Sequence, residues 1–192
     1  MHEVALERRD PTQLLDEIAR LRADIACLEA RVEELDKLAH QDALVPLFNR
    51  RGMLRELEMM IARHQRHGTP AAVLFVDLND LKLLNDQYGH VGGDAALVSV
   101  AEKLRAGTRA TDCVARLGGD EFCVLLDHAD EKIALETAER LVDSIARDEF
   151  LFEEISIPLS VAIGVTLIEE GDSPATVLAR ADKAMYRVKD AA

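Results

Sequence analysis

The sequence is short of basic residues and has no long apolar run, and each shortage excludes a class of protein. Its 192 residues include 23 lysines and arginines against 36 aspartates and glutamates, for a net charge of −13. A nucleic-acid surface needs a basic stripe, so we expect no nucleic-acid partner. No apolar run reaches membrane length, and residues 1–5 do not resemble a signal peptide. We therefore expect a cytoplasmic protein with no membrane partner.

Cysteines are also scarce. The three present, Cys27, Cys113 and Cys123, lack the spacing of a metal site, and their odd number leaves one without a disulfide partner. We therefore expect reduced thiols, which again favours the cytosol.

Two adjacent carboxylates, Asp120 and Glu121, follow a Gly-Gly pair at 118–119, between apolar runs at 113–117 and 123–126. Apolar runs joined by Gly-Gly predict a β-hairpin, because a two-residue primed turn needs positive φ at its centre. The carboxylates would then lie beside a bare turn that a phosphate can approach closely. The alternative is a hairpin tip that is merely solvated.

A further carboxylate, Asp77, lies near the end of an unbroken apolar run at 71–78 that is rich in β-branched and aromatic residues. Such a run predicts a strand buried on both faces. Asp77 and Asp120 could then meet as oxygen ligands for Mg²⁺, which takes carboxylates together with substrate phosphates. The alternative is that Asp77 or Asn79 caps the next helix.

Further motifs extend this pattern along the chain. They are Asp42-x-Leu44, Asn49-Arg50-Arg51, Lys82-x-x-Asn85-Asp86-x-x-Gly89-His90, Gly93-Asp94, Arg116 before the glycine pair, Ser160-x-x-x-Gly164, and Ala181-Asp182-x-Ala184-x-Tyr186-x-x-Lys189. In this order and spacing, the motifs resemble the GGDEF family of diguanylate cyclases, which condense two GTP into cyclic di-GMP. The resemblance runs from Asp42 to Lys189.

The resemblance implies an α+β fold for residues 42–192, with a five-stranded, palm-like sheet of the nucleotide-cyclase type flanked by helices. Local patterns agree with strands grouped on one sheet and helices packed against it. We expect strands at 151–157 and 159–168, a short helix after the first strand, and longer helices at about 49–67, 93–105, 130–147 and from 173.

The resemblance also implies a metal site and catalytic residues. Four residues would hold Mg²⁺, with Mn²⁺ as an alternative ion: Asp77, Leu78 through its carbonyl, Asp120 and Glu121. Asp120, with Glu121 beside it, would also take the proton of the attacking 3′-hydroxyl, whose pKa metal ions lower. Lys82 would offset the charge that builds on the transferring phosphoryl group.

Six residues would bind the GTP substrate: Asn85, His90, Asp94, Gly118, Gly119 and Lys189. Asn85 and Asp94 would recognise guanine, since an amide both donates and accepts and a carboxylate accepts from the ring N–H and the exocyclic amine. His90 has a structural role as its alternative. Lys189, expected at the β/γ-phosphates, has as its alternative a solvated lysine at a helix C-terminus.

An Arg-x-x-Asp segment, Arg109 to Asp112, ends six residues before Gly118. It resembles the inhibitory site of the family, which binds the product cyclic di-GMP as a feedback inhibitor. Arginine suits this task, because its planar fork binds phosphates and guanine edges. Arg140 corresponds to the position that, in some members of the family, completes this site from a neighbouring domain. The alternative is a surface ion pair of little energetic value.

Residues 1–41 carry a different pattern. Apolar residues recur there with four-three spacing at Leu14, Ile18, Leu21, Ile25, Leu28, Val32, Leu35 and Ala39. β-Branched residues mostly at a and leucine at d favour a parallel two-stranded coiled coil. We expect an N-terminal helix that forms a homodimer, with an amphipathic helix packed on its own domain as the alternative.

Two other functions stay open at this point. One is a catalytically silent receptor that binds cyclic di-GMP at Arg109 and Asp112, although Asp77, Lys82 and Asp120 argue against it. The other is an interaction module whose domain docks on partners. An assay with GTP and Mg²⁺ separates all three.

Overall fold

The computed structural model describes residues 11–147 and 150–190. The chain divides into a first unit that ends at Ala39 and a second unit that begins at His40. Within the described ranges, no helix is both long and apolar enough to cross a membrane.

Helix α1, Pro11–His40, is a single 30-residue helix. The seven large apolar residues of its predicted seam are between 42 % and 65 % exposed. Ion pairs on its flanks, Glu17 with Arg20 and Glu33 with Lys37, have the spacing that supports a solvated helix. A single chain therefore leaves the seam in contact with solvent.

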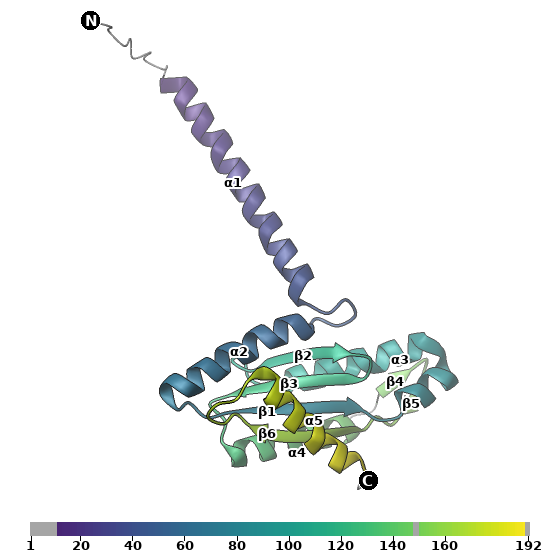
Figure 1. The fold of residues 1–192 in the computed structure, drawn as a ribbon. Helices are drawn as coiled ribbons and strands as arrows, with labels where there is room; N and C mark the ends of the chain where they lie inside the picture. The colour runs from purple at the N-terminus through teal and green to yellow at the C-terminus, as the bar shows by residue number, and fades with distance from the viewer. Residues whose placement is uncertain (1–10, 148–149, 191–192) are drawn as a thin grey trace, which may run out of the picture. The chain divides into compact units, whose positions relative to one another are not determined.

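The second unit contains a four-stranded antiparallel sheet with the strand order β2-β3-β1-β6 (Figure 1). Its strands are β1 Ala71–Leu78, β2 Cys113–Gly118, β3 Glu121–Asp127 and β6 Val161–Leu167. All eight residues of β1 are buried, as the apolar run predicts. A separate hairpin pairs β4 Phe150–Phe152 with β5 Ile155–Ile157.

The prediction of five strands in one sheet is wrong in its count. Beside β2, pairing is reduced to Phe48, which forms an isolated parallel bridge to Ala115. The chain before Phe48 does not continue along β2, because the Asp42 amide donates to the Leu47 carbonyl at 2.9 Å and folds this segment back on itself.

The run 151–157, predicted as one strand, is instead the β4–β5 hairpin. Glu153 and Glu154 form its two-residue turn, with φ of 48° and 67°. Positive φ at both central residues gives the primed turn whose twist suits a hairpin, but glycine or asparagine usually occupies these positions. Two glutamates therefore gave no turn signal in the sequence.

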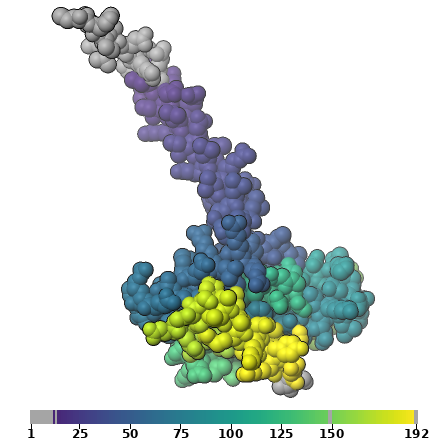
Figure 2. Space-filling view, in the orientation of Figure 1, coloured from purple at the N-terminus to yellow at the C-terminus, as the bar shows by residue number. Residues whose placement is uncertain are grey.

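Helices cover both faces of the sheet. They are α2 Arg50–His67, α3 Leu81–Ala106, α4 Glu131–Arg147 and α5 Pro174–Asp190. Since successive strand residues point to opposite faces, Leu74 and Val76 pack with α3 and α4, and Val73 and Phe75 pack with α2 and α5. Figure 2 shows α5, in yellow, on the outside of the domain. The sheet is the middle of three layers, which leaves chemistry to the ends of its strands.

All three cysteines are free: Cys27 is exposed, whereas Cys113 and Cys123 are buried. Burial raises the pKa of the Cys113 thiol to about 12, and the charge of Glu56 acts in the same direction. The thiolate is the reactive form of cysteine, and the burial of Cys113 among apolar side chains is that of a packing residue.

A clamp of charged groups holds α5 to the end of β6. The Arg180 guanidinium donates to both carboxylate oxygens of Asp172, at 2.6 and 2.7 Å, and to the Leu167 carbonyl at 2.7 Å. The Asp172 side chain is only 6 % exposed. The bonds from Arg180 lower the pKa of Asp172 from 3.8 to about 2, and further hydrogen bonds contribute.

We expect Asp172→Asn to destabilise the domain by about 1–3 kcal/mol at neutral pH, because Arg180 loses its charged partner. Since folding lowers the pKa of Asp172 to about 2, its stabilising effect is complete above about pH 4 and is lost as the pH falls toward 2. The urea midpoints of wild type and variant should therefore converge in acid. Glu169→Gln is the control, because the Glu169 carboxylate also faces Arg180 but interacts with it weakly. Its Oε2 atom lies 3.9 Å from Arg180 Nη1, and its side chain is 67 % exposed. An equal destabilisation by both variants would contradict the role of Asp172.

Candidate active site

Asp77 and Glu121 lie directly opposite each other in the β1–β3 ladder. Opposed residues of antiparallel strands share a face, here the face covered by α2 and α5. The Leu78 amide donates to the Asp120 carbonyl at 3.0 Å, which ties the tip of the β2–β3 hairpin to the end of β1. The predicted carboxylates thus lie at one end of the sheet.

The hairpin turn is centred one residue later than the Gly-Gly pair. Gly118 pairs with Glu121, so Gly119 and Asp120 occupy the turn. Gly118 and Gly119 have φ of 146° and 54°, where side chains are rarely tolerated. Both glycines are exposed, with open space around the positions of their missing Cβ atoms. The backbone of the tip is therefore accessible beside a half-buried Asp120.

The alternative that Asp77 or Asn79 caps the next helix is wrong. The N-cap of α3 is Asp80, in a left-handed conformation. Asn79 instead bonds to Ser160, with its Nδ2 atom donating to the Ser160 hydroxyl at 3.0 Å. The Asp77 side chain therefore does not cap α3 and can interact with other groups.

Arg116 holds the tip of the hairpin, a role that its sequence position alone did not reveal. Its Nη2 and Nε atoms donate to the Gly119 carbonyl at 2.8 and 3.1 Å. Its Nη1 atom donates to Asp42 Oδ1 at 3.2 Å, and this oxygen also accepts from the amides of Leu44 and Val45. These bonds connect the entry of the domain to the turn.

Lys189 reaches Asp77 from the last turn of α5, with 2.5 Å between Nζ and Oδ1. Asp77 is buried, whereas the lysine side chain is 41 % exposed. The bond to Asp77 raises the pKa of Lys189, and the charges of Asp77, Asp120 and Asp80 act in the same direction. The lysine expected at the substrate phosphates is thus paired with an expected metal ligand.

Glu121 lies among like charges. Burial raises its pKa, and the charges of Asp120, Asp182 and Asp77 raise it further, against the opposing charge of Arg50. Asp182 and Arg50 line a groove together with Glu121, and sequence reasoning assigned neither to the site. Both residues occur in the sequence motifs that carry the family resemblance, and this occurrence could have indicated that they belong to the site. Such crowding of carboxylates favours a nearby cation.

Asn85 and Asp94, expected to recognise guanine, lie on either side of a kink in α3. Gly89 has φ 71° and ψ 173°, so the predicted short helix and the helix after it are joined at this residue. The Asn85 side chain lies against Gly93, where an added Cβ would be 2.0 Å from Asn85 Oδ1. Asp94 is exposed. Two further site residues expected on this helix are also exposed, namely the expected catalytic Lys82 and the expected substrate residue His90.

Asp112 uses both carboxylate oxygens to hold its own loop. Oδ2 accepts from the Arg109 amide at 2.9 Å, and Oδ1 accepts from the Asp127 amide at 3.2 Å. The Arg109 side chain is exposed. Arg140 donates to the Gly107 carbonyl at 2.7 Å. The three residues of the expected inhibitory site therefore lie around the connection between α3 and β2.

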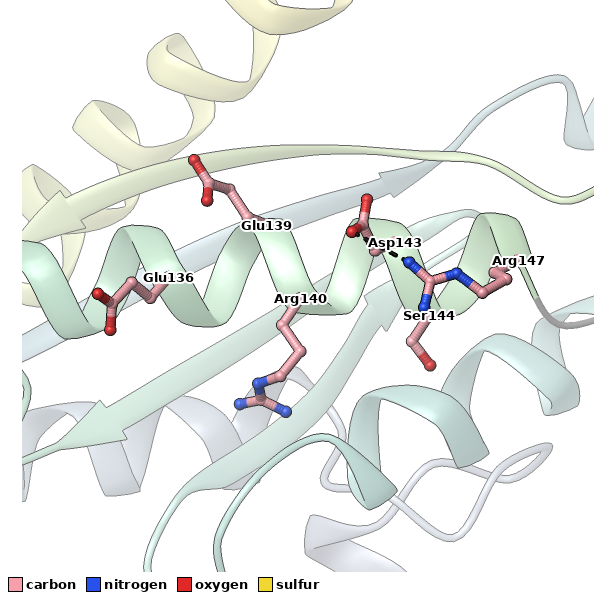
Figure 3. A pocket seen from close by; sticks show the side chains of 6 residues that line it. All are labelled: Glu136, Glu139, Arg140, Asp143, Ser144 and Arg147. Carbon is pink, nitrogen blue, oxygen red and sulfur yellow. Dashed lines mark hydrogen bonds and ion pairs between the residues drawn. The ribbon is translucent and has the colours of Figure 1, made fainter.

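Arg140 belongs to an exposed, charged face of α4 (Figure 3). Asp143 and Arg147 on this face are paired at 3.5 Å, whereas Arg140 extends away from them. The hollow on this face is lined by Glu136, Glu139, Arg140, Asp143, Ser144 and Arg147. The Arg140 guanidinium is oriented by the carbonyl of Gly107.

The donor set at the end of β1 fits a hard divalent ion. Among the described residues, no three His, Cys, Asp or Glu side chains form a ready-made metal cage. Mg²⁺ is usually held by one or two carboxylates together with phosphates and waters. Asp77 already faces the cationic Nζ of Lys189, which shows that this position accepts positive charge.

Comparison with known proteins shows which family the domain belongs to. A family model described as "Diguanylate cyclase, GGDEF domain" matches residues 39–192. The chain belongs to the GGDEF family. Its GGDEF domain has the mixed helix and antiparallel-sheet fold that the sequence predicts.

Two relatives come from Pseudomonas aeruginosa. The bifunctional diguanylate cyclase/cyclic di-GMP phosphodiesterase MucR is 40 % identical over 158 residues, which cover 82 % of this chain and 23 % of MucR. The diguanylate cyclase TpbB is 36 % identical over 196 residues, covering 95 % of this chain and 45 % of TpbB. The chain thus spans less than half the length of either relative.

A solved structure resembles the fold over nearly the whole chain. It is the coiled coil and GGDEF domain of DgcB from Caulobacter crescentus in complex with c-di-GMP, with a TM-score of 0.86 and 24 % identity. The similarity covers 93 % of this chain and 95 % of the DgcB chain. The fold of this chain is therefore similar to that of a solved chain that contains a coiled coil and a GGDEF domain.

Proposed function

We propose that this GGDEF domain is a diguanylate cyclase, which condenses two GTP molecules into cyclic di-GMP and releases two pyrophosphates. The observation that carries the proposal is the meeting of Asp77, Asp120 and Glu121 at one end of the sheet, beside Lys189. Relatives at 40 % and 36 % identity that are named diguanylate cyclases support the same reaction. GTP is a cytosolic nucleotide, so the proposal includes a cytoplasmic location.

The residues of the site divide the chemistry between them. Asp77, the Leu78 carbonyl, Asp120 and Glu121 would hold Mg²⁺ or Mn²⁺, which when bound lowers the pKa of the 3′-hydroxyl and offsets phosphate charge. Asp120 accepts the proton of the 3′-hydroxyl while the hydroxyl oxygen forms a bond to the α-phosphorus of the other GTP. The bond to pyrophosphate breaks in the same step. Lys82 and Lys189 stabilise the negative charge on the phosphates.

Substrate recognition would lie in α3 and at the hairpin tip. Asn85 and Asp94 bind the guanine edge, with His90 in the same pocket. The exposed backbone of Gly118 and Gly119 allows close approach of a phosphate. Each domain then holds one GTP.

Two such domains must face each other, because each 3′-hydroxyl attacks the GTP of the other domain. We propose that α1, the described part of the helix predicted for residues 1–41, forms a parallel dimeric coiled coil that keeps two domains near one another. Residues 1–10 lie outside the described residues. The exposed four-three seam of α1 supports this.

The proposal is tested by incubating the purified protein with GTP and Mg²⁺ and separating the nucleotides by chromatography. We expect cyclic di-GMP and pyrophosphate in a ratio of about one to two, since each of the two phosphodiester bonds formed releases one pyrophosphate. Binding of cyclic di-GMP without turnover would indicate the receptor function instead. If the protein shows neither turnover nor nucleotide binding, the remaining function is that of an interaction module.

Feedback inhibition is also part of the proposal, with product bound at Arg109, Asp112 and Arg140. We expect Arg109→Ala to raise the inhibition constant of cyclic di-GMP about ten- to a hundredfold, because charge-assisted contacts are lost. Initial turnover should change little. The measurement is initial rate against added cyclic di-GMP at several GTP concentrations, where wild type should show noncompetitive inhibition.

Arg109 is the cleaner test of this site, because Asp112 also holds its loop through two backbone amides. Asp112→Ala should act in the same direction. The control is Arg66→Ala, which removes an exposed arginine of α2. Wild-type inhibition in both Arg109→Ala and Asp112→Ala would rule out the inhibitory site.

A further inference from the structure

The kink of α3 needs support from outside the helix. Gly89 interrupts the helical conformation with φ 71° and ψ 173°. A glycine at such a break permits many angles between the two helical segments. The side chains packed around the break must therefore select the angle observed.

Phe152 of β4 lies beside both segments of α3. Its ring lies edge-on to that of Tyr88, with centroids 6.2 Å apart and planes at 72°. Beyond the kink, a Cβ on Gly92 would lie 3.4 Å from Phe152 Cε1 and 2.6 Å from Tyr88 Cβ. The Phe152 ring is thus close to both Tyr88 before Gly89 and Gly92 after it.

These contacts lie next to the residues expected to bind guanine. Gly92 precedes Gly93, which the Asn85 side chain touches, and Asp94 follows. Gln87 Nε2 donates to the Tyr88 hydroxyl at 2.9 Å and further restrains the ring against Phe152. A change of angle at the kink would therefore alter the spacing between Asn85 and Asp94.

We propose that Phe152 is a positioning residue for guanine recognition, which braces the kink of α3 and so sets the spacing of Asn85 and Asp94. The inference rests on the proposed function, because it takes GTP as the ligand. The brace belongs to the β4–β5 hairpin, which is separate from the main sheet and carries none of the residues assigned to the reaction.

Phe152→Ala tests the brace with two nucleotides. ITP lacks the exocyclic amine that Asp94 would accept from, so the ratio of kcat/KM for GTP over ITP measures guanine recognition. We expect KM for GTP to rise about three- to tenfold and the ratio to fall by a similar factor, the range typical of a lost aromatic pair. The kcat for GTP should change less than about twofold, because Phe152 lies outside the reacting groups.

Matched variants separate positioning from folding. Leu151→Ala alters the neighbouring position of β4, whose side chain is 63 % exposed, and should keep the wild-type ratio. Phe152→Tyr keeps the aromatic ring and should also keep the wild-type ratio of kcat/KM for GTP over ITP. If thermal unfolding shows that Phe152→Ala is not folded at the assay temperature, Phe152→Leu retains apolar bulk without the ring and is measured in its place.

An unchanged ratio in a folded Phe152 variant would overturn the inference. So would equal losses of kcat for GTP and ITP with the ratio retained, since that is the result of a purely structural role. If wild type makes no cyclic di-GMP, the proposed function fails on its own. Calorimetric binding of GTP and ITP to wild type and variant then decides the inference independently.

Discussion

Asp120→Asn is expected to lower the rate of cyclic di-GMP formation by at least about a hundredfold without unfolding the domain. The neutral amide neither accepts the proton of the 3′-hydroxyl nor supplies charge for a divalent ion, and loss of a general base alone typically costs this much. Folding should be preserved, because Asp120 bonds to the Leu78 amide through its backbone carbonyl. Initial rates and urea midpoints, measured together, check both parts.

The control for this variant is Asp143→Asn. Asp143 is an exposed aspartate of α4, paired with Arg147 at 3.5 Å, and its loss should leave turnover near wild type. Substantial activity in Asp120→Asn would remove the carboxylate from the mechanism, whereas an unfolded variant would show that the side chain has a structural task.

Ile25→Asp should dissociate the proposed dimer and make turnover steeply dependent on protein concentration. Ile25 lies in the middle of the exposed seam of α1, so pairing would bury one added charge from each copy without a partner. That cost is large, and we expect the dimer dissociation constant to rise at least about a hundredfold. Sedimentation velocity gives the oligomeric state, and rates over a range of protein concentrations give the activity.

Ala26→Asp is the matched control, because it places the same charge one residue further along α1 and outside the four-three seam. It should sediment and turn over like wild type. A fully active dimer of Ile25→Asp would mean that the GGDEF domain associates through another surface.

Much of the fold could be predicted because its signals are local. The apolar run of β1 and the cap of α2, where Asn49 accepts from the Gly52 amide at 2.9 Å, both follow from a few neighbouring residues. The strand count could not be predicted, because it depends on how the segment before Phe48 folds back. The Glu153-Glu154 turn was hidden because its residue types seldom adopt positive φ.

The site was less accessible to sequence reasoning than the fold. Resemblance to a family assigned Asp77 and Asp120 to the expected site, whereas residue chemistry alone left a helix cap as an equal explanation for Asp77. The pairing of Lys189 with Asp77 and the bonds of Arg116 to the hairpin tip join residues far apart in the chain. No local sequence pattern predicts such contacts, so they became visible only in the three-dimensional structure.

The ion pair between Lys189 and Asp77 has a consequence for the order in which ligands enter. The lysine acts as a built-in counter-ion, so a free divalent cation that approaches Asp77 must compete with a charge already in place. If GTP binds as proposed, its phosphates would offer the Lys189 ammonium group a new anionic partner and would release the Asp77 carboxylate. Metal and nucleotide are therefore expected to enter as one complex, with the ion alone held weakly.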